Sequence, residues 1–188
     1  MDAVRIVGGD LKGRRLATPK TDATRPTTDR NREMLFNILA HAYTEQLRGN
    51  VLDLFAGTGA LGCEALSRGA RSCAFVENTA AGRALLHENI EQLGLAGRAH
   101  ILRRDATKLG SRDSLPTATL AFADPPYGKG LGELAAASLT AHDWLSPGGL
   151  FVLEERASSL PQSLPGFTFQ QRREAGEGAF GFFLRDAA

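Results

Sequence analysis

The chain has few cysteines and no long run of apolar residues. Its two cysteines, Cys63 and Cys73, are too few for a disulfide framework and are not spaced as a Cys-x-x-Cys zinc or redox pair. A membrane-spanning helix needs about 18 or more apolar residues in succession, and residues 1–17 lack the apolar centre of a secretory signal peptide. We therefore expect a cytoplasmic protein with no membrane segment, in which both cysteines are small buried side chains.

The net charge is also small, at +1, but the positive charge is unevenly placed. Basic residues gather near the N-terminus, where few acids oppose them: Arg5, Lys12, Arg14, Arg15, Lys20, Arg25, Arg30 and Arg32. A basic segment on a near-neutral body favours a polyanionic partner. A solvated tail with no partner would show the same charge pattern.

The length of 188 residues suits one domain with a short extension. Residues 4–16 have the pattern of a short hairpin or an arm lying on the domain, and residues 27–29 offer caps for a helix that runs to about Leu47. Apolar runs then predict strands over 51–55, 72–77, 99–103, 120–123 and 150–154, alternating with helices over 61–67, 80–93 and 131–145. Residues 167–171 and 179–184 flank a glycine-rich turn and predict a closing antiparallel hairpin. The expected class is α/β, with a mostly parallel sheet covered on both faces.

A glycine-rich turn follows the first strand of this alternation. Gly57, Gly59 and Gly62 fit the pattern G-x-G-x-x-G at the point where the strand leads into a helix, and Glu77 ends the next strand about 20 residues later. Glycines allow close approach of a ligand to the backbone, and the following helix N-terminus presents unpaired N–H groups. Because a carboxylate at the position of Glu77 accepts hydrogen bonds from ribose hydroxyls, the pattern indicates an adenosine-type cofactor.

Two further acids help to distinguish between the cofactors that contain adenosine. Asp53 lies beside the glycine-rich turn, where its carboxylate suits the ammonium of a methionine moiety better than a pyrophosphate. It could instead cap local N–H groups. Asp105 follows another strand and could accept a hydrogen bond from an adenine amino group, with Ala106 against the ring, or it could serve as a helix N-cap.

The tetrad Asp124-Pro125-Pro126-Tyr127 follows an apolar run at residues 120–123. Two prolines cannot continue a strand ladder, so the chain turns there, at the sheet edge where ligands bind in α/β folds. The Asp124 carboxylate and the Pro125 carbonyl can accept the two hydrogens of an exocyclic amine and so orient its lone pair. Tyr127 can stack on the base, which must then be unpaired or flipped out.

The remaining polar candidates carry less information. Lys129 lies between two glycines just after the tetrad and could contact a phosphate or sit in a plain solvent loop. The four histidines are not spaced as metal ligands, so no metal site is predicted. Glu154 and Glu155 follow the fifth strand, and nothing in their pattern assigns them a role.

Taken in order, these motifs resemble those of class I S-adenosylmethionine-dependent methyltransferases. Residues 5–9, 11–16 and 25–39 narrow the resemblance to the bacterial small-subunit ribosomal RNA guanine-N2 methyltransferases, and it covers nearly the whole chain. This resemblance implies a Rossmann-like fold with a seven-stranded sheet. It also implies methyl transfer to the N2 amine of a guanine in 16S rRNA, with an assembled small-subunit particle as substrate.

The resulting expectations are specific. We expect a basic N-terminal arm or hairpin over residues 1–26, a methyltransferase domain over 27–188, and a monomer. The expected catalytic residues are Asp124, Pro125 and Tyr127. The expected cofactor-binding residues are Asp53, Phe55, Ala56, Gly57, Gly59, Glu77, Asp105 and Ala106. The expected RNA-binding residues are Lys12, Arg14, Arg15, Arg25, Arg30, Arg32 and Lys129.

Three alternatives share part of this pattern. A nicotinamide-dependent oxidoreductase uses the same glycine-rich turn. A DNA adenine-N6 methyltransferase uses the same tetrad but normally carries a separate recognition domain, for which 188 residues leave little room. A non-catalytic RNA-binding assembly factor would keep the basic segment alone.

Overall fold

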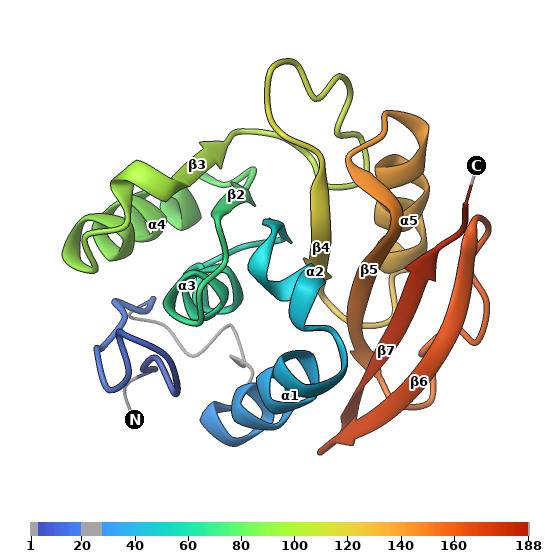
Figure 1. The fold of residues 1–188 in the computed structure, drawn as a ribbon, viewed down its shortest axis with the longest axis horizontal. Helices are drawn as coiled ribbons and strands as arrows, with labels where there is room; N and C mark the ends of the chain where they lie inside the picture. The colour runs from blue at the N-terminus through green and yellow to red at the C-terminus, as the bar shows by residue number, and fades with distance from the viewer. Residues whose placement is uncertain (1–3, 20–27, 188) are drawn as a thin grey trace.

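A computed structural model describes residues 4–19 and 28–187 of the chain. Seven strands in this part form one sheet in the order β3-β2-β1-β4-β5-β7-β6 (Figure 1). The strands are β1 (Asn50–Leu54), β2 (Ser72–Val76), β3 (Ala99–Leu102), β4 (Ala118–Ala123), β5 (Leu145–Arg156), β6 (Phe167–Ala175) and β7 (Gly178–Arg185). Strands β1 to β5 pair in parallel, while β7 pairs antiparallel with both β5 and β6. The predicted α/β sheet with a C-terminal antiparallel hairpin is therefore confirmed.

Both faces of the sheet are buried, because successive side chains of a strand point to opposite faces. In β4, Leu120 and Phe122 enter one apolar cluster, and Ala121 and Ala123 enter the other. The first cluster contains side chains of α1 to α4, and the second contains those of α5 and of nearby loops. Helices on both faces explain why these strands read as nearly continuous apolar runs.

The helices are close to their predicted positions, with two corrections: the helix predicted over residues 131–145 ends at Ala141, and a second predicted helix is divided. They are α1 (Asp29–Ala42), α2 (Thr44–Arg48), α3 (Ala60–Ser67), α4 (Ala80–Gln92) and α5 (Leu131–Ala141). The prediction of one helix from residue 29 to about Leu47 is wrong, because Tyr43 leaves helical geometry at φ −136° and separates α1 from α2. The Tyr43 ring stacks on Phe182, with centroids 5.9 Å apart, and its hydroxyl accepts a hydrogen bond from Gln171. This packing outweighs the helical preference of the local sequence.

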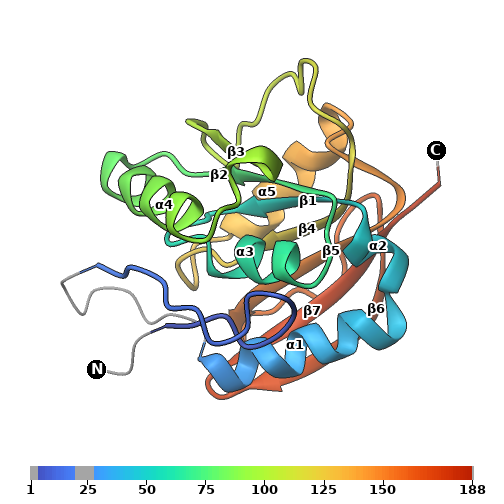
Figure 2. The same ribbon diagram turned by 60° about the vertical axis from the view of Figure 1, so that its left-hand side comes forward.

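Residues 4–16 form the predicted hairpin and pack on the domain beside α1 and α3 (Figure 2). Val4, Ile6 and Leu16 are buried in the first apolar cluster. Polar contacts add to this burial: the Glu64 carboxylate accepts the N–H of Val7 at 2.8 Å, and the Asn89 side chain accepts the N–H of Ala17 at 2.6 Å. The predicted boundary near residue 26 lies outside the described residues.

The structure also bears on two further expectations, those for the cysteines and for a membrane-spanning segment. Both cysteines are free and buried, and burial raises the pKa of each thiol. Within residues 4–19 and 28–187, no helix has the length and apolar character needed to cross a bilayer.

Candidate active site

A pocket of about 1160 Å³ opens at the carboxyl ends of the parallel strands. The register pairs Leu54 of β1 with Val76 of β2 and with Ala123 of β4, so the residues that follow these three strands lie side by side. Strands β1 and β4 are the point where the chain order of the sheet reverses, which is where ligands bind in open α/β sheets. This volume is slightly above the usual range of about 300–1,000 Å³ for small-molecule sites, so the pocket can hold a nucleoside cofactor together with part of a second ligand.

The glycine-rich turn forms one wall of this pocket. Phe55, Ala56 and Gly57 all line it, as predicted for the cofactor site. Phe55 has φ 57°, an uncommon conformation for a bulky residue that is typical of functional turns. Gly59 is not among the lining residues. Gly59 is the N-cap residue of α3 and has a φ of 77°, a conformation that favours glycine. A Cβ at this position would lie 2.6 Å from the Leu86 side chain, so Gly59 shapes the turn without lining the pocket.

Asp53 lines the pocket from the end of β1 but is only 2% exposed. Its Oδ2 accepts the N–H of Gly62 at 2.9 Å, so the capping role that the sequence left open is present. Burial raises the pKa of Asp53 to about 7; the Gly62 N–H lowers it in part, and the nearby charge of Glu77 raises it further. A cation placed beside Asp53 would favour its ionised form.

Glu77 holds the turn together and also lines the pocket. One carboxylate oxygen accepts the N–H of Gly57 at 3.0 Å, and the other accepts the N–H and hydroxyl of Thr79 at 2.7 and 2.6 Å. These bonds fix the carboxylate at the end of β2, where the sequence predicted a contact with ribose hydroxyls. A carboxylate has about four acceptor sites, so this role is compatible with the observed bonds.

The structure does not bring Asp105 into the pocket. Its carboxylate is exposed and accepts the N–H and hydroxyl of Thr107 at 2.8 and 2.7 Å, bonds that lower its pKa. Asp105 therefore stabilises a local turn, and the predicted contact with adenine is not supported. Its neighbour Ala106 does line the pocket, as predicted, and so does Arg104, which the sequence reasoning missed.

The tetrad Asp124-Pro125-Pro126-Tyr127 lines the same pocket and follows β4, the strand paired with β1. Asp124 and Tyr127 are partly buried and Pro125 is buried. The Tyr127 hydroxyl donates to Oε1 of Glu154 at 3.1 Å, and burial, followed by the charges of Glu154 and Asp124, raises the tyrosine pKa. The predicted catalytic residues and the glycine-rich turn thus share one cavity.

Sequence reasoning assigned no role at this site to two acids or to the predicted β6–β7 turn. Glu154 is buried and lines the pocket, while Glu155, also buried, accepts the N–H of Gly128 at 3.1 Å and so holds the loop after the tetrad. The β6–β7 turn closes one side of the pocket through Gly176, Glu177 and Gly178. The sequence contained an indication of a role for these acids, since two consecutive carboxylates at the end of an apolar strand are unusual.

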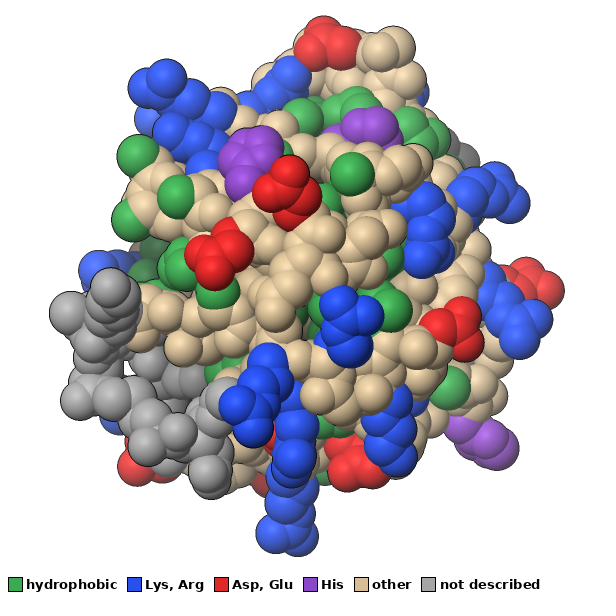
Figure 3. All heavy atoms as spheres, turned by 90° about the vertical axis from the view of Figure 1, so that its left-hand side faces the viewer, with side chains coloured by type: hydrophobic (Ala, Val, Ile, Leu, Met, Phe, Trp, Pro, Cys, Tyr) green, Lys and Arg blue, Asp and Glu red, His purple; other side chains and the backbone are tan. Residues whose placement is uncertain are grey.

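The predicted RNA-binding residues differ in their surroundings. Lys12, Arg14, Arg15, Arg30 and Lys129 are exposed. Arg25 lies outside the described residues. Figure 3 shows basic side chains spread over the face that carries α4 and the N-terminal hairpin, with acidic side chains between them.

Arg32 requires a correction. It is 1% exposed, and its guanidinium donates to the Asp29 carboxylate and to the Arg5 carbonyl oxygen, both at 2.6 Å. The side chain therefore ties α1 to the N-terminal hairpin. A guanidinium buried in these contacts is not available to an RNA phosphate, so the prediction for Arg32 is wrong.

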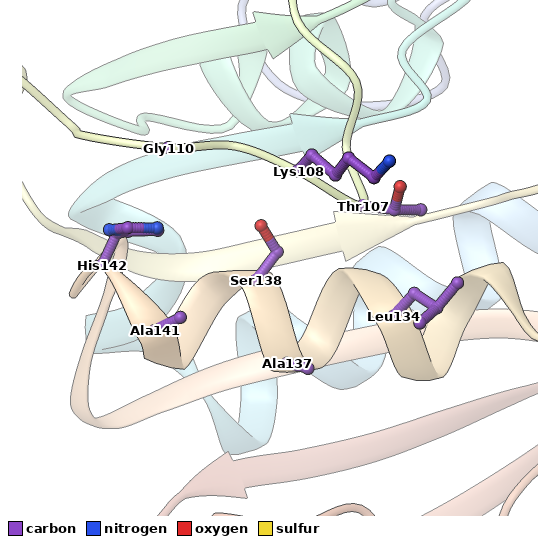
Figure 4. A pocket seen from close by; sticks show the side chains of 8 residues that line it. All are labelled: Thr107, Lys108, Gly110, Leu134, Ala137, Ser138, Ala141 and His142. Atoms are coloured by element: carbon purple, nitrogen blue, oxygen red, sulfur yellow. The ribbon is translucent and has the colours of Figure 1, made fainter.

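A second hollow lies between α5 and the loop that follows β3 (Figure 4). Its lining includes Lys108, Leu134, Ser138 and His142. The Ser138 hydroxyl accepts the N–H of Leu109 at 2.8 Å and thereby fixes the loop. The hollow holds none of the predicted site residues.

The sheet order, the glycine-rich turn after β1 and the tetrad after β4 together define a class I S-adenosylmethionine-dependent methyltransferase. Solved structures agree: the chain superimposes on a structure titled "Putative methyltransferase yhhF from Escherichia coli" with a TM-score of 0.83 and 35% identity, covering 100% of both chains. A structure titled as a putative RNA methyltransferase from Pyrococcus horikoshii, at 16% identity and a TM-score of 0.69, shares the fold.

The chain belongs to the family described as Conserved hypothetical protein 95, whose model matches residues 4–184. It is 36% identical to "Ribosomal RNA small subunit methyltransferase D" of Escherichia coli strain K12, over 98% of this chain and 91% of the relative. It is 33% identical to "Putative rRNA methyltransferase YlbH" of Bacillus subtilis strain 168, over 92% of this chain and 94% of the relative. The protein is a methyltransferase.

The cofactor of this class is S-adenosylmethionine, and the pocket fits it. The carboxylates of Asp53 and Glu77 suit the ammonium and the ribose hydroxyls of this molecule. Backbone at Gly57 is open to a ligand, because an added Cβ there would meet nothing closer than 3.9 Å. The resemblance to dinucleotide-binding turns is therefore explained by the adenosine that both cofactors contain.

Proposed function

We propose that the protein transfers a methyl group from S-adenosylmethionine to the N2 amine of a guanine in the 16S rRNA of the small ribosomal subunit. The observation that carries the proposal is the common pocket of the glycine-rich turn and the Asp124-Pro125-Pro126-Tyr127 tetrad. The names of the relatives, which include a small-subunit rRNA methyltransferase, support rRNA as the substrate. We also propose that it acts in the cytoplasm on an assembled small-subunit particle, and that it does so as a monomer.

The first wall of the pocket holds the cofactor in this proposal. Asp53 binds the α-ammonium, Glu77 binds ribose hydroxyls, and Ala106 packs against the adenine. Phe55 to Gly57 contribute backbone and apolar surface. When bound, S-adenosylmethionine supplies an electrophilic methyl group on a sulfonium.

The second wall orients the amine. The lone pair of an exocyclic amine is delocalised into its ring, so the amine is a weak nucleophile. Asp124 and the carbonyl of Pro125 accept its two hydrogens and aim the lone pair, and proline keeps that carbonyl in a fixed position. Tyr127 stacks on the base, while its hydroxyl bond to Glu154 keeps the ring in place. Orientation is the main source of catalysis here.

RNA reaches this pocket across basic surface. Arg30 on α1 adjoins Asn31, which lines the pocket, and Lys129 follows the tetrad in an exposed loop. Lys12, Arg14 and Arg15 lie on the N-terminal hairpin, where they can contact phosphates further along the RNA. We include Arg25 among the residues that contact phosphates because of its positive charge alone.

The proposal is tested by mapping methylated guanines in 16S rRNA from a bacterial strain that lacks this protein. We expect one N2-methylguanosine to be absent, to return with the wild-type gene, and to stay absent with Asp124→Ala. Loss of the oriented amine should lower the rate by about 100-fold or more. Calorimetry with S-adenosylmethionine should show that the variant still folds and binds cofactor. An unchanged methylation map in the deletion strain would refute the substrate, and full activity of the variant would refute the role of Asp124.

A further inference from the structure

The pocket contains a buried carboxylate to which the proposed transfer reaction gives no contact with the substrate. Glu154 is 5% exposed, lies near the carboxyl end of β5 and lines the pocket together with Asp124 and Tyr127. The register pairs Ala123 of β4 with Leu153 of β5. Asp124, the residue after β4, therefore lies next to Glu154, which is still within β5 and pairs with Phe180 of β7.

Glu155 provides a contrast at the neighbouring position. Successive side chains of a strand point to opposite faces, and Glu155 does not line the pocket. Its carboxylate instead accepts the N–H groups of Gly128 and Arg156 at 3.1 and 2.7 Å. The two acids are thus alike in sequence and burial but differ in what they face.

A carboxylate accepts hydrogen bonds and does not donate them, so Glu154 favours donor groups beside it, as its bond from the Tyr127 hydroxyl shows. On the Watson–Crick edge of guanine, the N2 amine lies next to a second donor, the N1–H. On adenine the corresponding ring nitrogen is an acceptor, which a carboxylate repels. A carboxylate adjacent to the amine-binding Asp124 therefore suits guanine and disfavours adenine.

We propose that Glu154 is a specificity-determining residue that accepts the N1–H of the target base while Asp124 and Pro125 hold its amine. This inference rests on the proposed function and deepens it, because it explains how a tetrad that can orient any exocyclic amine selects guanine. Sites built to hydrogen-bond a substrate group reject analogues that lack the group more strongly than apolar pockets do.

The test uses the base analogue 2-aminopurine, which keeps the amine on C2 but has an unprotonated N1. Small-subunit particles are assembled with guanosine or with 2-aminopurine riboside at the nucleotide mapped as above, and initial rates of methyl transfer are compared. Wild-type protein should methylate guanine at least about tenfold faster. Glu154→Gln should slow the reaction on guanine and lower the ratio of the guanine rate to the 2-aminopurine rate by about tenfold. The reason is that an amide can donate to the unprotonated nitrogen of the analogue.

Two variants serve as controls for the guanine-to-analogue rate ratio. Glu155→Gln changes the neighbouring buried acid outside the pocket, and Tyr127→Phe removes the hydroxyl bonded to Glu154 while keeping the ring. Both should keep the wild-type ratio, whatever they do to the absolute rates. If Tyr127→Phe changes the ratio as Glu154→Gln does, Glu154 acts only through the tyrosine and the inference is overturned.

The remaining outcomes are also decisive. A Glu154→Gln ratio equal to that of wild type overturns the inference. If that variant does not fold, as judged by loss of S-adenosylmethionine binding, the wild-type protein alone decides, since equal rates on guanine and 2-aminopurine contradict recognition of N1–H. Failure of wild type to methylate any guanine in the particle would instead refute the proposed function itself.

Discussion

Asp53 shows how one residue can serve both the fold and the cofactor. Its carboxylate accepts the Gly62 N–H that begins α3, and it lines the pocket at the end of β1. Burial raises its pKa to about 7, so between about pH 4 and 7 the folded chain binds a proton that the unfolded chain has lost. The contribution of Asp53 to the free energy of unfolding therefore falls as the pH rises through that window, and above pH 7 the cost of the buried charge is present in full.

This linkage predicts a pH-dependent cofactor affinity. A bound ammonium favours ionised Asp53, so the affinity for S-adenosylmethionine should rise by up to about tenfold per pH unit below pH 7 and level off above it. Asp53→Asn should weaken binding at pH 8 and flatten the profile, while raising the free energy of unfolding of the ligand-free protein more at pH 8 than at pH 5. Calorimetry and urea denaturation measure these quantities. Asp10→Asn, on an exposed hairpin residue, is the matched control. A profile that keeps its slope in Asp53→Asn would contradict the proposed ammonium contact.

At the scale of elements, the N-terminal hairpin is a basic surface attached to the domain by buried contacts. Its apolar residues share the core of α1, α3 and α4, while Lys12, Arg14 and Arg15 remain outside. Arg14 donates to the carbonyl oxygen of Gln92 at 2.5 Å, which holds its guanidinium near the end of α4. A charge fixed on a rigid element can contact a phosphate at a smaller entropic cost than a charge on a flexible tail.

Replacing Arg14 and Arg15 by Ala should therefore weaken RNA binding. For single-stranded RNA the slope of log affinity against log salt is negative, and each lost phosphate contact makes it less steep by about 0.7. The measurement is a filter-binding titration of 16S rRNA between about 50 and 200 mM salt. The double variant Arg48→Ala and Arg71→Ala is the control, since both residues are exposed and precede β1 and β2, at the sheet edge away from the pocket. Equal slopes in the two variants would show that the hairpin makes no phosphate contacts.

At the scale of the whole molecule, the pocket exists because five parallel strands end at one edge and the β6–β7 turn closes one side of it. The residues that line this pocket are far apart in the chain, from Pro19 to Gly178. Binding there should stabilise the folded state as a whole, because the pocket does not exist in the unfolded chain.

This gives a prediction that also separates the two adenosine cofactors. At a concentration 100 times the dissociation constant, S-adenosylmethionine should add about 2.7 kcal/mol to the free energy of unfolding. For a chain of this size that raises the melting temperature by roughly 5 to 11 °C. NADH at the same concentration should leave it unchanged. An NADH shift as large as that of S-adenosylmethionine would contradict the assignment of the methyl donor. Asp53→Asn is a suitable reference, because its shift should be smaller at pH 8.

Much of this could be predicted from the sequence, and the exceptions have physical reasons. The tetrad was recognisable because two prolines after an apolar run leave few conformations for the chain. Arg32 was misassigned because charge alone does not reveal burial, and its partners, Asp29 and the Arg5 carbonyl oxygen, meet only when the hairpin folds onto α1. The contact of Asp105 with adenine stays a prediction, since its carboxylate bonds locally to Thr107 and is not part of the pocket lining.

Apolar periodicity and the backbone limits of glycine and proline were enough to predict the order of strands and helices, the glycine-rich turn and the turn at Asp124. Which acids share the pocket depends on how distant segments pair. Glu154 and Glu155 look equivalent in the sequence, and the pleat of β5 together with its register against β4 turns only Glu154 toward Asp124 and Tyr127. Side-chain direction in a sheet is set by pairing between distant segments, which no local pattern contains.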